Sequence, residues 1–248
     1  MNAVFTMTQP IQAHDRTPAD PLGLGLSPGD AHYRAYIGPP EDYDLVAAMC
    51  FGLLTSLGLR GRHRLLDLGC GSLRLGRLLI PYLNTGNYYG LEPNQWLVEE
   101  GLAQELGQGI VPLKQPHFVF GDSCQLIGKT GFFDFAIAQS IFSHCGVDLL
   151  TQHLRDMHEA LSHSGALLAT FFTGKVDSDA SGWIYPDCVE YSPARMAELA
   201  SACGYEFELL DWQHPRQRWA LFAKPGFNRS WLAGRPLSWN TWLQYGPK

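Results

Sequence analysis

From Arg64 onward, the sequence alternates short apolar runs with amphipathic segments of helical length. The runs FDFAIA and ALLATFF are nearly all apolar, as is typical of strands covered on both faces of a parallel sheet. This alternation predicts an α/β fold with a mostly parallel, doubly wound sheet. The predicted strands are Leu65–Leu68, Tyr88–Leu91, Phe118–Phe120, Phe133–Ala138 and Ala166–Phe172. The predicted helices between them are Leu73–Leu83, Gln95–Leu106 and Asp148–Leu161.

The C-terminal part of the fold departs from this alternation. A helix is indicated from Ser192 and Pro193 to Gly204. Two strand-like runs, YEFELLDW and QRWALFAK, then follow with only QHPR between them, and strands joined by so short a connection pair antiparallel. We therefore predict a three-layer α/β sandwich with a doubly wound, seven-stranded, mostly parallel sheet that ends in an antiparallel hairpin.

The chain has 248 residues, which suits one domain with short extensions. Residues 1–30 are rich in turn-forming residues without periodicity and are expected to form a loose N-terminal arm. The domain is predicted to span residues 31–225, and its first part, 31–60, to form a helical lid in two pieces separated by GPP. The Trp-rich tail at 226–248 is expected to pack on the domain, with apolar surface covered by Trp231, Trp239 and Trp242.

The charge and the cysteine pattern limit the cellular compartment and the kinds of binding partner that we expect. The formal net charge is −6 and the basic residues are dispersed, so we expect no nucleic-acid partner. The six cysteines are scattered singly without metal-ligand spacing, which favours a reducing compartment and no metal site. No signal-peptide pattern and no apolar run long enough to span a membrane is visible, so we expect a cytoplasmic protein without a membrane partner.

The stretch LLDLGCGSLRLGRLL, from Leu65 to Leu79, joins the first predicted strand to a helix through a glycine-containing loop. It lacks the GxxxxGK[ST] pattern of a phosphate-binding loop. A dinucleotide fingerprint would place its third glycine at Arg74, and the nearest later glycine, Gly76, is displaced by two positions. Asp67 at the strand end would repel a pyrophosphate and attract a cationic amino group.

Three acidic residues end or closely follow predicted strands: Asp67, Glu92 and Asp122. Ligands of open α/β sheets bind outside the carboxyl ends of the strands, so we expect these acids to converge there. Glu92 is placed to accept the hydroxyls of a ribose, and Asp122 to meet an amino-purine edge. A ligand with positive charge and no phosphate fits this set, and S-adenosylmethionine is such a molecule.

The order DLGCG, GLEP, GDS, FDFAIAQSIF and LSHSGALLATFF, within Arg64 to Lys224, resembles the class I S-adenosylmethionine-dependent methyltransferases. The resemblance implies that the loop after the first strand holds the methionine part of the cofactor, that Glu92 holds the ribose and that Asp122 and Ser123 contact the adenine. It implies that Gln139 lines the transfer site. Many members carry a third glycine where this chain has Leu73. The predicted cofactor-binding residues are Asp67, Gly69, Gly71, Ser72, Arg74, Glu92, Pro93, Asp122, Ser123 and Gln139.

His144 lies just after the fourth predicted strand, where the resemblance places the reacting group of the acceptor. Its pKa range suits a base that takes a proton from a hydroxyl, and a structural role capping the loop is an equal alternative. Some members of the family bind a metal through acids beside this histidine. Here the neighbours are Ser140 and Ser143, so no metal is expected. In the long insert that follows the fifth strand, Trp183, Tyr185 and Tyr191 are candidates for an acceptor pocket or for surface packing. His214 and Arg216 are expected to lie in the hairpin turn, far from the cofactor.

The predicted function is transfer of a methyl group from S-adenosylmethionine to a small-molecule acceptor, with oxygen as the expected methylated atom and S-adenosylhomocysteine as the product. The place after the fourth strand reads AQSIF and lacks the Asn/Asp-Pro-Pro-aromatic motif of enzymes that methylate amide or base nitrogen. Two alternatives remain open at this point: an NAD-dependent oxidoreductase on a related fold, and a non-catalytic methyltransferase-like partner protein.

Overall fold

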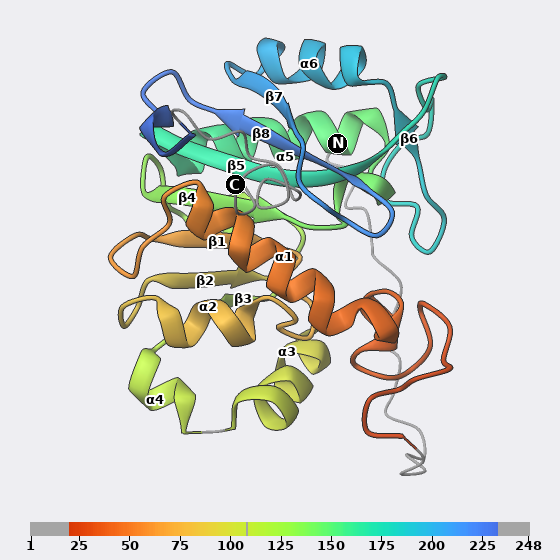
Figure 1. The fold of residues 1–248 in the computed structure, drawn as a ribbon, viewed down its shortest axis with the longest axis vertical. Helices are drawn as coiled ribbons and strands as arrows, with labels where there is room; N and C mark the ends of the chain where they lie inside the picture. The colour runs from red at the N-terminus through yellow and green to blue at the C-terminus, as the bar shows by residue number, and fades with distance from the viewer. Residues whose placement is uncertain (1–19, 108, 233–248) are drawn as a thin grey trace, which may run out of the picture.

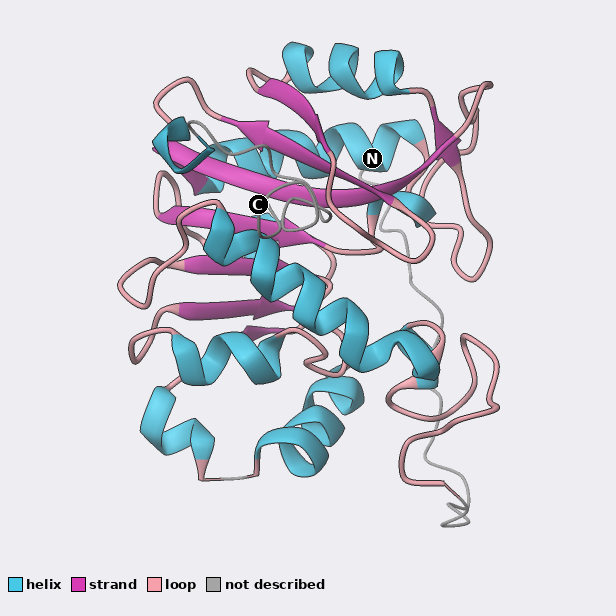
Figure 2. Cartoon of the chain, viewed as in Figure 1, coloured by secondary structure: helices cyan, strands magenta, loops and turns pink. Residues whose placement is uncertain are grey.

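The computed structural model describes residues 20–107 and 109–232, which form three layers with a central sheet (Figure 1, Figure 2). The strands are β1 (Leu65–Leu68), β2 (Tyr88–Leu91), β3 (His117–Val119), β4 (Phe133–Ala138), β5 (Leu161–Thr173), β6 (Glu190–Tyr191), β7 (Glu206–Leu210) and β8 (Arg218–Ala223). Their order is β3-β2-β1-β4-β5-β8-β7, and the short β6 pairs with β5 beside this path. The predicted doubly wound, mostly parallel sheet with a C-terminal hairpin is confirmed, and β6 is a small addition to it.

The helices are α1 (Tyr43–Ser56), α2 (Gly76–Tyr82), α3 (Gln95–Gly101), α4 (Ile110–Lys114), α5 (Val147–Ala160) and α6 (Pro193–Ala202). Short 3₁₀ turns lie at Ala35–Ile37, Pro40–Asp42, Cys124–Ile127, Phe142–His144 and Arg229–Leu232. The predicted bounds of α5 are wrong by one residue at each end, and two other predicted helices differ more: α2 begins three residues later than Leu73, and α3 passes into a π-helix at Leu102–Leu106. The helix α4 was not predicted, because it is short and weakly patterned.

Two hydrophobic clusters lie on opposite faces of the sheet, as expected for helices on both sides. On one face, α1 and α2 contribute residues such as Leu53 and Leu79 to a cluster with Leu65 of β1. On the other face, α5 and α6 contribute residues such as Leu154 and Met196. Figure 1 shows α1 in front of the sheet and α5 behind it. None of the helices in the described part of the chain combines the length and apolar character that crossing a bilayer requires.

Strand direction decides which loops meet at one edge of the sheet. The strands β1, β2, β4 and β5 are parallel, so the loops that follow them share an edge. The strand β8 is antiparallel to β5, and β7 is antiparallel to β8, so β7 runs in the same direction as β5. The connection from β7 to β8, residues 211–217, therefore lies at the edge where β1 and β4 end.

The predicted two-piece helical lid at 31–60 is only partly helical. Its second piece is α1, whose apolar side chains belong to the core. Its first piece forms only the 3₁₀ turn Ala35–Ile37, because Gly38 leaves it at a φ of 135° and two prolines follow. Of the predicted arm and tail, residues 1–19 and 233–248 lie outside the described residues, and so do Trp239 and Trp242. Trp231 is within them, and the Arg60 guanidinium lies 4.5 Å from its ring centroid.

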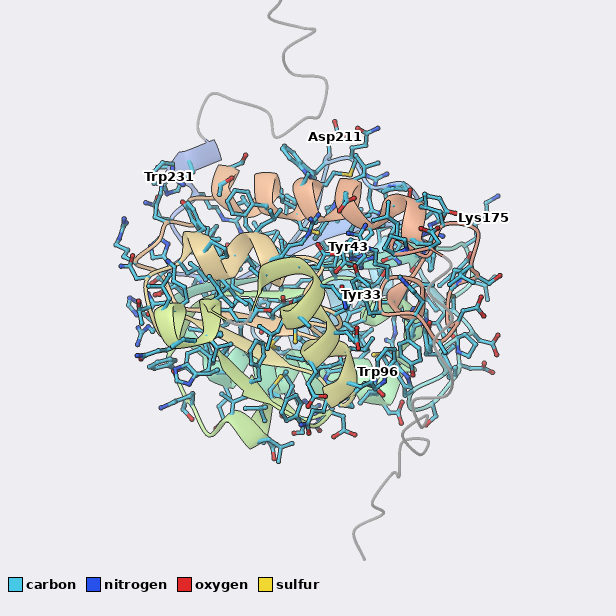
Figure 3. The ribbon with its side chains drawn as sticks, turned by 90° about the horizontal axis from the view of Figure 1, so that it is seen from below. Tyr33, Tyr43, Trp96, Lys175, Asp211 and Trp231 are labelled. Atoms are coloured by element: carbon cyan, nitrogen blue, oxygen red, sulfur yellow. The ribbon has the colours of Figure 1, made fainter. Side chains whose placement is uncertain are left out.

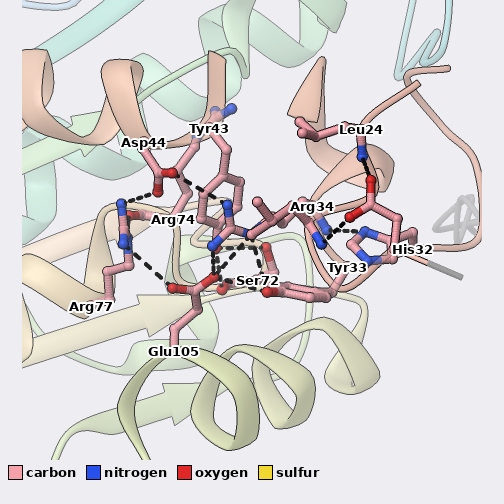
Figure 4. A network of polar contacts seen from close by, with 12 residues as sticks. Leu24, His32, Tyr33, Arg34, Tyr43, Asp44, Ser72, Arg74, Arg77 and Glu105 are labelled. Atoms are coloured by element: carbon pink, nitrogen blue, oxygen red, sulfur yellow. Dashed lines mark hydrogen bonds and ion pairs between the residues drawn. The ribbon is translucent and has the colours of Figure 1, made fainter. Parts of the chain in front are cut away.

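A buried ionic network attaches the N-terminal segment, residues 20–42, to the domain (Figure 4). The Arg34 guanidinium pairs with the Glu105 carboxylate at 2.5 Å, and the side chains of both are only 8% exposed. Glu105 also accepts a hydrogen bond from the Tyr33 hydroxyl at 2.9 Å and pairs with Arg77 at 3.4 Å. Asp44 contacts the same two arginines, but its side chain is 62% exposed. Glu105 is therefore the principal buried counter-charge of this network.

Glu105→Gln should lower the free energy of unfolding by about 3 kcal/mol, because it leaves a buried guanidinium without its counter-charge. The matched control is Asp44→Asn, which removes an exposed carboxylate from the same two arginines and should cost less than about 1 kcal/mol. Urea unfolding of the three proteins measures both changes. Equal losses from the two variants would contradict the dominant role of Glu105.

Candidate active site

A cavity of about 330 Å³ opens at the edge of the sheet where β1, β2, β4 and β5 end. Its walls combine segments that are far apart in the sequence: the N-terminal segment, the loops after β1, β2 and β4, the insert between β5 and α6, and the β7–β8 connection. The lining residues include Pro28, Tyr36, Ile37, Asp67, Gly69, Gly71, Arg74, Glu92, Asn94, Gln139, Ser140, His144, Phe172, Trp183, Tyr185, Cys188, Arg216 and Gln217.

The glycine loop after β1 packs closely against neighbouring loops beside the cavity. Gly69 and Gly71 have φ angles of 66° and 54°, a conformation that L side chains rarely adopt. A Cβ at Gly69 would lie 2.1 Å from Cδ1 of Ile141, and one at Gly71 would lie 3.0 Å from Cγ2 of Ile37. Both glycines are therefore required by the backbone and by the close approach of neighbouring loops.

Asp67 lines the cavity and is almost completely buried. Its carboxylate accepts a hydrogen bond from the Tyr88 hydroxyl at 2.8 Å. Burial raises the pKa of Asp67 to about 7, although the Tyr88 hydrogen bond and the charge of Arg74 act in the opposite direction. A cation bound in the cavity would restore its charged form.

Glu92 joins the loops after β1 and β2. One carboxylate oxygen accepts a hydrogen bond from the backbone N–H of Gly71 at 3.0 Å, and the other accepts two at 2.9 Å from the backbone and side chain of Asn94. Burial raises the pKa of Glu92, and these three hydrogen bonds lower it. A carboxylate can accept about four hydrogen bonds, so Glu92 retains capacity for a ligand hydroxyl.

Arg74 and Gln139 line the cavity, and His214 lies next to Gln139. The Arg74 guanidinium is buried and donates to the side-chain carbonyl of Gln139 and to the backbone carbonyl of Ile37. Desolvation lowers the pKa of Arg74. Both groups that accept hydrogen bonds from Arg74 are neutral. The nearby charge of Asp67 acts through space and raises the pKa of Arg74. A buried guanidinium in this position is suited to an anionic ligand group.

The structure divides the ten predicted cofactor residues into two groups. Those that line the cavity are Asp67, Gly69, Gly71, Arg74, Glu92 and Gln139. Ser72, Pro93, Asp122 and Ser123 are not among its lining residues. Ser72 is fully buried, and its backbone carbonyl accepts a hydrogen bond from the Tyr43 hydroxyl at 3.0 Å, so it supports the loop. Asp122 is exposed, and the Ser123 hydroxyl caps the 3₁₀ turn Cys124–Ile127.

His144 lies at the other end of the cavity, in the 3₁₀ turn after β4. Its Nδ1 is 2.6 Å from the backbone carbonyl oxygen of Asp187, so Nδ1 carries the proton and Nε2 is left as an acceptor. Burial lowers the pKa of His144, which keeps the ring neutral. The rings of Tyr185 and Trp183 lie with centroids 5.0 and 5.6 Å from it. The ring is thus oriented as a neutral proton acceptor.

Two further walls of the cavity come from the β7–β8 connection and from the N-terminal segment. Arg216 and Gln217 line it, and His214 Nε2 is 3.4 Å from Gln139 Nε2, so the expectation that His214 and Arg216 lie far from the strand ends is wrong. The direction of β7, given above, is the signal that would have placed them. The other wall is Tyr36, whose ring meets Trp96 edge-on at 5.2 Å and whose backbone carbonyl accepts a hydrogen bond from the Tyr185 hydroxyl at 2.5 Å.

These contacts connect the N-terminal segment to the rest of the site. Figure 3 shows Tyr43, Tyr33 and Trp96 one after another between α1 and α3. The rings of Tyr33 and Tyr43 meet edge-on at 6.2 Å. Aromatic packing therefore continues from Tyr43, which contacts the glycine loop, to the wall formed by Tyr36.

No family model and no curated protein sequence matches the chain. Solved structures match its fold. A magnesium protoporphyrin IX methyltransferase of Synechocystis PCC 6803, crystallised with bound S-adenosylmethionine, superposes with a TM-score of 0.55 at 17% identity, covering 75% of this chain and 81% of its own. A putative O-methyltransferase of Nostoc punctiforme PCC 73102 gives a TM-score of 0.59 at 16% identity, with 75% and 57% covered. The structure of DhpI in complex with S-adenosylhomocysteine gives 0.52 at 18% identity, with 75% and 90% covered. The class I methyltransferase fold is thereby confirmed.

The protonation of His144 can be measured directly. We expect its ring to titrate below the usual value of 6.5 and to remain neutral at neutral pH, with the proton on Nδ1, because burial disfavours the charged ring. Nitrogen-edited NMR spectra recorded across a pH series report both the tautomer and the titration, and the spectrum of His144→Gln assigns the signal. A midpoint at or above 6.5 would contradict the effect of burial, and a proton on Nε2 would exclude that atom as the acceptor.

Proposed function

We propose that this chain, which has the fold of the class I S-adenosylmethionine-dependent methyltransferases, binds S-adenosylmethionine and transfers its methyl group to an oxygen of a small-molecule acceptor. The observation that carries the proposal is the pair of buried carboxylates, Asp67 and Glu92, that meet the glycine loop at one cavity. A cationic ligand without phosphate is the chemistry that such a pair favours.

The methionine end of the cofactor fits the groups around the glycine loop. Asp67, with its raised pKa, would pair with the ammonium group. Arg74 would pair with the carboxylate. The His214 ring supports this second role: Nδ1 accepts from the backbone N–H groups of Arg216 and Gln217, so the proton lies on Nε2 and faces the amide nitrogen of Gln139. An anion bound at Arg74 would free the Gln139 carbonyl to accept from His214.

The nucleoside end would extend along the loops after β2 and β3. Glu92 would accept hydrogen bonds from the ribose hydroxyls. The backbone N–H of Gly121 donates to the Glu92 carbonyl at 3.3 Å, so the loop that carries Asp122 and Ser123 lies next to the ribose acid. This proximity supports the predicted role of Asp122 and Ser123 as adenine contacts, although both lie outside the cavity lining.

Bound S-adenosylmethionine supplies a methyl carbon that is already activated by its sulfonium, and S-adenosylhomocysteine is the product. The protein then has to hold the acceptor oxygen in line and exclude water, and such orientation contributes about 7–11 kcal/mol. His144 Nε2 would take the proton that the acceptor hydroxyl loses. The aromatic side chains beside His144 would keep water away from the reacting atoms.

Cofactor binding tests the proposal. S-adenosylhomocysteine and S-adenosylmethionine should bind the wild-type protein in isothermal titration calorimetry, and NAD should not. Asp67→Asn and Glu92→Ala should each weaken binding at least about tenfold, because a hydrogen bond to a charged group contributes about 1.5–3 kcal/mol. The matched control Asp211→Asn changes an exposed acid on the β7–β8 connection that does not line the cavity, and should bind as the wild type does. Binding of NAD alone would favour the oxidoreductase alternative.

Cofactor affinity should also depend on pH through Asp67. Since the pKa of this buried carboxyl is raised to about 7, Asp67 is protonated below that value and cannot pair with an ammonium group. The affinity for S-adenosylhomocysteine should therefore fall about tenfold between about pH 8 and about pH 6. Calorimetry at several pH values measures the slope, and Asp67→Asn should flatten it. A wild-type affinity that is independent of pH over this range would remove Asp67 from the ammonium site.

A further inference from the structure

The β7–β8 connection brings an unusual amide into the cavity. Gln217 is only 8% exposed and lines the cavity with Ser140 and His144. Its amide nitrogen donates to the Ser140 hydroxyl at 2.7 Å and approaches the Ser143 hydroxyl at 3.4 Å. Among the described residues, no group donates a hydrogen bond to its Oε1, although this atom is buried. A buried amide oxygen without a donor is costly, and a ligand donor would remove that cost.

The position of this amide is determined by the loop around it. His214 Nδ1 accepts from the backbone N–H of Gln217 at 3.0 Å and from that of Arg216 at 3.2 Å. Both serines bonded by the Gln217 side chain belong to the segment after β4 that ends at His144. Gln217 is therefore held beside the turn that carries the proposed base, and not beside the acids of the cofactor end.

The charge and shape of this end limit the acceptor that it can hold. The acids that line the cavity, Asp67 and Glu92, belong to the cofactor end, and no lining acid of the described chain adjoins His144 or Gln217. A cationic amine would find no counter-charge there. Phe172, Trp183 and Tyr185 supply aromatic walls. The cavity, at about 330 Å³, is at the small end of ligand sites and also has to hold part of the cofactor, which favours a small acceptor.

We propose that the acceptor is a small aromatic compound without a cationic group that carries two hydroxyl groups: one is methylated beside His144, and the other donates a hydrogen bond to Gln217 Oε1. This inference rests on the proposed function and adds its substrate class. In the reaction the new O–CH₃ bond forms as the S–CH₃ bond breaks, the electron pair of that bond stays on sulfur, and the hydroxyl proton passes to His144 Nε2. Gln217 gains and loses no proton; it selects and orients the acceptor.

Binding of simple probes to the complex with S-adenosylhomocysteine tests this assignment. The probes are catechol, resorcinol and hydroquinone, each compared with phenol and with its own monomethyl ether by calorimetry. At least one diol should bind the wild-type protein about threefold to tenfold more tightly than phenol, as one added hydrogen bond predicts. Gln217→Met, which keeps the size and removes the amide, should abolish this preference, and Gln217→Glu, which keeps an acceptor oxygen, should retain it.

The controls separate the possible failures. Gln213→Met makes the same chemical change at an exposed glutamine of the same connection that does not line the cavity, and should keep the preference for the diol. S-adenosylhomocysteine should bind Gln217→Met as it binds the wild type, which shows that the variant is folded. No preference for any diol in the wild type, or a preference that survives in Gln217→Met, would overturn the inference while leaving the proposed function intact. Failure of the wild type to bind S-adenosylhomocysteine would overturn both.

Discussion

The burial of two carboxylates at one edge of the sheet is the constraint on which the site depends. Asp67 and Glu92 end neighbouring parallel strands, so their charges face the same cavity and each raises the free energy of ionising the other. Neutral donors satisfy them in part: the Tyr88 hydroxyl for Asp67, and backbone and amide N–H groups for Glu92. Hydrogen bonds of this kind fix the positions of the oxygens without cancelling their charge. The remaining imbalance favours a cation over a pyrophosphate.

A buried ion pair outside the cavity holds one wall of the cavity, the N-terminal segment, in place. The pairing of Arg34 with Glu105 attaches the N-terminal segment to the helical segment that follows Glu92, and the Tyr43 hydroxyl bonds the backbone of the glycine loop. Tyr36 and Ile37 lie two and three residues after Arg34, so this attachment also places them against the cavity. The same segment receives the Tyr185 hydroxyl from the insert. The two ends of the cavity and the N-terminal segment are thus packed together, although their residues are distant in the sequence.

The sequence was sufficient for those features that follow from periodicity and strand ends. Apolar runs and their alternation with helices predicted the sheet, the strand-end rule placed Asp67 and Glu92 at one cavity, and the family resemblance placed Gln139 there. Features that depend on tertiary packing were beyond such rules. The wall at Tyr36 is attached to the domain through the distant Glu105, and Asp122 is exposed although its loop lies next to Glu92. The hairpin residues are an intermediate case, because the antiparallel pairing of β8 with both β5 and β7 determines that their connection lies at the ligand edge.

Leu73 shows why a glycine count alone is an incomplete guide to such a loop. It stands where many related sequences have a third glycine, yet its φ of 61° is the left-handed conformation that glycine adopts without cost. That conformation costs a side chain about 1–2 kcal/mol. Leu73 is fully buried in the cluster formed by α1 and α2, and burying a leucine contributes about 1.5–3 kcal/mol. Burial therefore offsets the backbone strain, and the loop keeps its turn with a leucine in place of glycine. Arg74 follows directly on this turn and lines the cavity, so the turn that departs from the glycine pattern also carries an arginine of the candidate site.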